Sequence, residues 1–151
     1  MGETYRILAA EMATEVPRVS NLRDQLWAGI ADLPALLCNS RLEDGLCSIL
    51  NVSVDGVEGE SLRFAMRELA VASGSACNSS AGEPSYVLRS LGRTDQQAEA
   101  SIRFSVGRFS TAAEMEQASV AFRAAVEYLL ALSPASQRPA PQKPAARGKE
   151  A

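Results

Sequence analysis

The sequence predicts an α+β fold, a small α/β sandwich in which helices cover one sheet. Helical and strand-like patterns alternate along the chain, and the longest helical patterns lie near its two ends. A length of 151 residues, with 46% hydrophobic and 22% charged residues, is typical of one globular domain. We therefore expect a single domain over residues 1–133, followed by a tail over residues 134–151.

The first element is a predicted helix over residues 3–31. Its apolar residues recur at spacings of three and four, from Tyr5 through Leu8 and Met12 to Ile30. Pro17 interrupts this pattern, so we expect a kink or a break there. The helix is expected to end at Asp32.

Short elements follow. Residues 47–54 suit a strand, and residues 58–69 suit a helix with one apolar side. Pro84 is well placed to begin a helix that ends at Leu91, and residues 95–100 predict another one or two helical turns. Apolar and polar residues alternate over residues 102–106, which indicates a strand with one buried face.

Thr111 is the predicted cap of a long helix that stops at Ser133. The tail after it contains four prolines among Ala, Gln, Lys and Arg, and this composition predicts disorder. Residues 1–133 contain 11 arginines and 17 acidic residues, a net charge of −6, whereas the tail carries +3. The acidic domain argues against nucleic-acid binding.

Nothing in the sequence resembles a secretory signal, and no apolar run approaches the roughly 18 residues of a membrane span. We therefore expect a cytoplasmic protein without a membrane partner. The chain has three cysteines and no histidine. Reduced thiols are the favoured interpretation; the alternative is a zinc site that uses all three cysteines and a carboxylate.

Cys77 differs from the other two cysteines in its surroundings. Cys38 and Cys47 each adjoin an apolar run, which favours a structural role. Cys77 lies in a segment of Ser, Gly, Ala and Asn over residues 73–82, which predicts an accessible loop. No Lys or Arg adjoins it to lower the thiol pKa, so the residues alone leave its role open.

Four segments resemble one known family. They are the runs VEGESL (57–62), LAVASGSAC (69–77), EPSYVLR (83–89) and SIRFSVGRF (101–109). In this order and spacing they resemble the C-terminal part of cysteine desulfurases of the IscS/NifS type, and the likeness runs from about residue 2 to residue 134. The resemblance implies the C-terminal small domain of a fold-type-I transferase that depends on pyridoxal phosphate (PLP).

The resemblance also implies roles for two residues. Cys77 matches the catalytic thiol that takes sulfur from L-cysteine as a persulfide, leaving L-alanine. Arg103 matches the arginine expected to bind the substrate carboxylate, for which a guanidinium fork is well suited. No metal site is expected, although a Cys77 persulfide could transiently ligate an iron–sulfur cluster. The family motif also contains Glu58, for which helix initiation is favoured, and Arg89 and Arg108 are interpreted as ion-pair residues.

The chain departs from the family in two respects. Its only lysines, Lys143 and Lys149, lie in the tail, so the PLP-binding lysine is not in this chain and no cofactor-binding residue is assigned. The expected partners are therefore a PLP-binding large domain or a full-length desulfurase subunit, and an iron–sulfur scaffold or a tRNA-thiolation acceptor. The basic tail replaces the family's scaffold-docking end. The alternative is an inactive lobe that acts as an interaction module or has no function.

Overall fold

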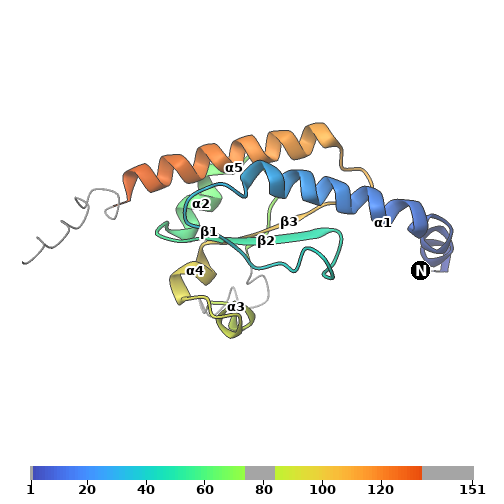
Figure 1. Cartoon of the computed structure of the whole chain (residues 1–151), viewed down its shortest axis with the longest axis horizontal. Helices are drawn as coiled ribbons and strands as arrows, with labels where there is room; N and C mark the ends of the chain where they lie inside the picture. Colours follow the sequence, from blue (N-terminus) through green and yellow to red (C-terminus); the bar gives the residue numbers. More distant parts are fainter. Residues whose placement is uncertain (1, 74–83, 134–151) are drawn as a thin grey trace, which may run out of the picture.

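The computed structural model describes residues 2–73 and 84–133. The elements, in chain order, are α1 (Gly2–Ile30), β1 (Leu36–Cys38), β2 (Ile49–Val54), α2 (Gly59–Ala65), α3 (Tyr86–Ser90), α4 (Asp95–Glu99), β3 (Ser101–Ser105) and α5 (Ala112–Leu132). Helices α1 and α5 cover one face of a sheet, and α3 and α4 lie on its other side (Figure 1). This layering is the predicted α+β fold.

The strands described here form one antiparallel sheet in the order β1-β2-β3. In the pairing of β2 with β3, Leu50 lies opposite Phe104 and Asn51 lies opposite Arg103. On the outer edge of β3, Ala72 forms an isolated bridge with Arg103. The central strand is therefore β2, and the chain before residue 74 runs along β3.

One face of the sheet belongs to the hydrophobic core. Leu50, Val52 and Ile102 are fully buried there, and the Phe104 ring meets the edge of the Phe122 ring of α5 at a centroid distance of 5.5 Å. Helices α1 and α5 pack closely along each other above this face. A Cβ atom on Gly29 would lie 2.7 Å from Cβ of Ser119, so this contact requires glycine.

Helix α1 confirms the helix predicted over residues 3–31, and of the kink or break expected at Pro17 the break does not occur. The helix continues through Pro17, at the cost of one backbone hydrogen bond. Every buried residue of α1 lies after Pro17, so the proline separates an exposed half from a packed half. These buried residues are Val19, Leu22, Arg23, Leu26 and Ile30.

The shorter predicted elements are confirmed with changed ends. The strands predicted over 47–54 and 102–106 are β2 and β3, whereas the helix predicted over 58–69 ends early, at Ala65. Strand β1 was not predicted, because three residues carry no readable periodicity. Residues 74–83 and the tail lie outside the described residues, so the predictions made for them stay predictions. None of the helices described here has the length and apolar character needed to cross a membrane.

Thr111 begins α5 as predicted. Its hydroxyl accepts the N–H of Glu114, and the Glu114 carboxylate accepts the N–H of Thr111, which together form a capping box. We expect Thr111→Ala to lower the free energy of unfolding by about 1 kcal/mol, because backbone N–H groups lose their partner. Urea denaturation followed by circular dichroism measures this change. Thr14→Ala, in an exposed turn of α1, is the control and should have little effect; equal losses would contradict the assignment.

Candidate active site

Arg103 lies on the face of the sheet that points away from the core. Its side chain is exposed at the edge of an open cleft of about 260 Å³. Among the described residues, its guanidinium has no hydrogen bond or ion pair, and none of the residues that line the cleft is acidic. The cleft can therefore bind an anion. It is lined by Asn39, Asn51, Ser85, Val87, Leu88, Leu91 and Arg103.

The backbone of Arg103 holds the chain that leads to Cys77. The N–H of Arg103 donates to the carbonyl of Ala72 at 2.7 Å, and the N–H of Ala72 donates back at 3.2 Å. Ser85, close to where the described chain resumes, lines the same cleft as Arg103. Cys77 itself lies outside the described residues. The two ends of the segment that contains Cys77 thus both lie beside Arg103.

The other two cysteines pack against the core. Cys38 and Cys47 are both half-buried, and the Cys38 thiol donates to the carbonyl of Ser40 at 3.4 Å. Cys47 lines an apolar cleft of about 310 Å³ beside α1. Within residues 2–73 and 84–133, no group of three or more His, Cys, Asp or Glu side chains could hold a metal ion.

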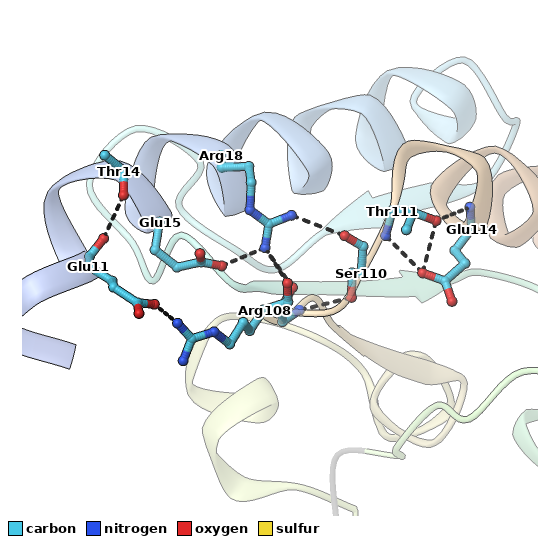
Figure 2. A network of polar contacts seen from close by, with 9 residues as sticks. Glu11, Thr14, Glu15, Arg18, Arg108, Ser110, Thr111 and Glu114 are labelled. Atoms are coloured by element: carbon cyan, nitrogen blue, oxygen red, sulfur yellow. Dashed lines mark hydrogen bonds and ion pairs between the residues drawn. The ribbon is translucent and has the colours of Figure 1, made fainter. Parts of the chain in front are cut away.

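A polar network fastens α1 to the loop after β3 (Figure 2). Arg18 of α1 donates to the carbonyls of Gly107, Arg108 and Ser110, at 3.3, 2.7 and 3.1 Å. The Arg108 side chain pairs with Glu11, one helical turn before Glu15, which itself pairs with Arg18. The network holds the end of the strand that carries Arg103. The predicted ion-pair role of Arg108 is confirmed, as is that of Arg89, which pairs with Asp95 at 2.6 Å.

Glu58 caps α2. Its carboxylate accepts the N–H groups of Glu60 at 2.9 Å and of Ser61 at 2.6 Å. Hydrogen bonding from the Ser61 side chain, and then from the backbone of Ser61 and Glu60, lowers the pKa of Glu58 below its ordinary value. The role is structural, as the helix-initiation prediction stated.

This lowered pKa gives a pH prediction. The stabilisation by ionised Glu58 is fully present above the unfolded-state pKa, near 4.5, and is lost as pH falls through the lower folded-state pKa. We expect Glu58→Gln to cost about 1 kcal/mol at pH 7 and to flatten the loss of stability below pH 4.5. Urea midpoints between pH 7 and pH 3 measure both effects. An unchanged acid slope in the variant would contradict this cause.

The described residues do not fit a covalent PLP site. This cofactor needs a lysine amine in a desolvated pocket, and residues 2–73 and 84–133 contain no lysine. No step through the cofactor is therefore assigned to these residues.

The sequence is 52% identical over 134 residues to the cysteine desulfurase IscS of Serratia proteamaculans, and 53% identical over 134 residues to that of Edwardsiella ictaluri. Each alignment covers 89% of this chain and 33% of the relative. The chain matches the C-terminal part of a cysteine desulfurase. The chain spans about a third of the length of the curated relatives it matches. No protein-family model matches it.

Solved structures of NifS-like proteins share the fold of this chain. A NifS-like protein from Rickettsia africae superposes with a TM-score of 0.65 at 16% identity, over 78% of this chain and 31% of that one. A second NifS-like protein superposes with a TM-score of 0.66 at 21% identity, over 82% of this chain and 31% of that one. The fold is thus that of a small α+β domain found in NifS-like proteins.

Sequence reasoning missed two residues of the cleft, Asn39 and Asn51. The alternation in residues 47–54 contained a signal for Asn51, because Leu50 and Val52 point to the core and the residue between them must point to the other face. Asn39 follows β1 and carries no periodic signal.

Proposed function

We propose that this chain is the sulfur-accepting lobe of a cysteine desulfurase, in which Cys77 receives sulfur from L-cysteine as a persulfide and passes it to an acceptor. The observation that carries the proposal is that both ends of the Cys77 segment lie beside Arg103. Cys77 is the fifth residue after Ala72, so it lies at most about 18 Å from it. A thiol on this segment is therefore tethered near a cation that has no partner among the described residues.

The chemistry suits these two side chains. The Cys77 thiolate attacks the sulfur of the substrate; an S–S bond forms, the carbon–sulfur bond breaks, and the carbon skeleton leaves as L-alanine after protonation. Arg103 binds the substrate carboxylate and so holds the sulfur within reach. The resulting persulfide transfers its outer sulfur to the thiol of an iron–sulfur scaffold or a tRNA-thiolation protein in the cytoplasm.

The carbon–sulfur cleavage needs an electron sink that this lobe does not supply. In the proposed enzyme PLP supplies it, held on the lysine of a large domain that accounts for the remaining two thirds of the relatives' length. We therefore expect the purified chain, mixed with L-cysteine and PLP, to release no alanine. Alanine release that depends on Cys77 would contradict the need for the large domain.

The Cys77 assignment has a direct test on the chain itself. After exposure to a small persulfide donor, we expect sulfur to accumulate on Cys77 and not on Cys38 or Cys47, which are half-buried against the core. Mass spectrometry of proteolytic peptides locates the added sulfur.

Two variants sharpen this test. Cys77→Ser should abolish the added sulfur, whereas the double variant Cys38→Ser, Cys47→Ser should retain it. Equal labelling of all three cysteines, or labelling that survives in Cys77→Ser, would remove the basis for the proposal.

The exposed half of α1 is the proposed contact with the large domain. Tyr5, Leu8, Met12 and Val16 follow the three-and-four spacing of one helix side, with exposed fractions between 41% and 69%. This stripe borders the apolar cleft of about 310 Å³ that Met12 and Val16 help to line. A stripe of this kind favours a partner with an apolar surface.

We expect the chain to bind a separately expressed PLP-binding large domain, and the double variant Leu8→Ser, Met12→Ser to weaken binding about tenfold, because apolar area stays in water. Isothermal titration calorimetry measures the affinity. Val120→Ser, at an exposed site of α5, is the control. If the two chains bind but release no alanine from L-cysteine, the interaction-module alternative is favoured. If the double variant and Val120→Ser bind with equal affinity, the stripe on α1 is not the contact surface.

A further inference from the structure

We propose that Asn51 is a second carboxylate-binding residue, which donates its side-chain N–H to the anion that Arg103 binds, and that Asn39 and Arg93 fix the orientation of its amide. This inference rests on the proposed role of Arg103 and adds a specificity-determining residue to the same cleft. It assigns a use to a polar network that the proposed sulfur chemistry leaves unexplained.

The strand pairing brings Asn51 and Arg103 together. The hydrogen bonds from Val54 N–H to the Ala100 carbonyl and from Val106 N–H to the Ser48 carbonyl set the alternation of the β2–β3 ladder. In that alternation Asn51 and Arg103 form a non-hydrogen-bonded pair, the kind whose side chains lie closer. Both side chains stand on the face away from the core, and both line the cleft.

The amide of Asn39 has one allowed orientation. The Nε of Arg93 lies 2.6 Å from one terminal atom of Asn39, and a guanidinium only donates, so that atom is the oxygen. The Asn39 nitrogen then points the other way. It donates to Oδ1 of Asn51 at 2.7 Å and to the Ser53 hydroxyl at 2.8 Å.

These hydrogen bonds determine which end of the Asn51 amide faces the cleft. Because Oδ1 of Asn51 accepts from Asn39, the Nδ2 group of Asn51, with its two hydrogens, is left for the cleft. No hydrogen bond of Nδ2 occurs within the described part of the chain. Asn51 therefore presents a donor to the cleft that Arg103 also lines, and none of the described lining residues carries a carboxylate to compete for either group.

Arg93 is itself held in place. Its second contact, from Nη2 to the carbonyl of Cys38 at 2.8 Å, ties the guanidinium to the end of β1. The guanidinium donor that orients Asn39 is therefore fixed by a contact outside the cleft. Two donors that line one cleft, one charged and one neutral, suit the two oxygens of a carboxylate better than a carboxamide.

The test uses the whole chain as Cys77→Ser, so that no sulfur chemistry intervenes. The sequence has four asparagines, and selective ¹⁵N-asparagine labelling gives one side-chain NH₂ signal pair for each. We expect L-alanine to shift the Asn51 signals saturably, and L-alaninamide, which lacks the carboxylate, to leave them in place. Arg103→Gln should abolish the L-alanine shift.

The positioning role of Asn39 has its own variant. Asn39→Asp can only accept, so Asn51 turns its NH₂ group toward position 39 and its oxygen toward the cleft, and L-alanine should bind roughly tenfold more weakly. Asn21→Asp, the same change on an exposed turn of α1, is the control. In the Asn51→Ala background, Asn39→Asp should cause no further loss, because it acts through Asn51.

The outcomes separate this inference from the proposed function. Unshifted Asn51 signals in the Cys77→Ser chain, while Cys77 of the unchanged chain accumulates persulfide, overturn the inference alone. Shifted Asn51 signals in the Cys77→Ser chain, while Cys77 of the unchanged chain accepts no sulfur, overturn the proposed function alone. Equal shifts with L-alanine and L-alaninamide contradict carboxylate recognition. A further loss of affinity for L-alanine on adding Asn39→Asp to Asn51→Ala contradicts the positioning role of Asn39 and assigns the effect to the added charge.

Discussion

The antiparallel register of β2 and β3 is the constraint on which the rest of the structure depends. It sends Leu50 and Phe104 into the core and places Asn51 and Arg103 on the opposite face. A slip of one residue in either strand would exchange the two faces and bury the Arg103 guanidinium among apolar side chains, an arrangement of high free energy. The core and the cleft that Arg103 lines are therefore specified by the same pairing.

Arginine is the only cation of the folded domain, and this shapes its electrostatics. Arg18 and Arg108 hold the loop after β3, Arg93 orients an amide, and Arg103 faces the cleft. The sequence has no histidine, the side chain that most often changes charge near neutral pH. Glu58, whose pKa is lowered by its capping hydrogen bonds, makes stability depend on acid pH.

The sequence predicted the elements whose pattern is long or regular. The spacing in α1 and α5 and the alternation in β3 identified these elements, because each buries one side against the core. The bridge between Ala72 and Arg103 was not predictable, because it depends on a partner about 30 residues away along the chain. At Pro17 the pattern predicted a kink or a break, and the helix continues through the proline because a long helix tolerates one missing hydrogen bond.

The candidate site shows the same division between local and long-range information. Arg103 and Cys77 came from the family resemblance, and the alternation of residues 102–106 placed Arg103 opposite the core-facing side chains. The orientation of the Asn39 amide follows from Arg93, which lies 54 residues further along the chain. No local pattern encodes such a contact. Residues that orient other residues are therefore harder to predict than those with a reactive or charged group of their own.

The division of α1 at Pro17 has a thermodynamic consequence. The half before the proline has about four turns, contributes no fully buried residue, and is too short to be a stable helix by itself in water. Its helical state therefore depends on neighbouring contacts, so helix formation there and the docking of an apolar surface are coupled equilibria. A partner would bind with less affinity than its buried area suggests, because part of the interaction free energy offsets the entropy lost as these turns become ordered.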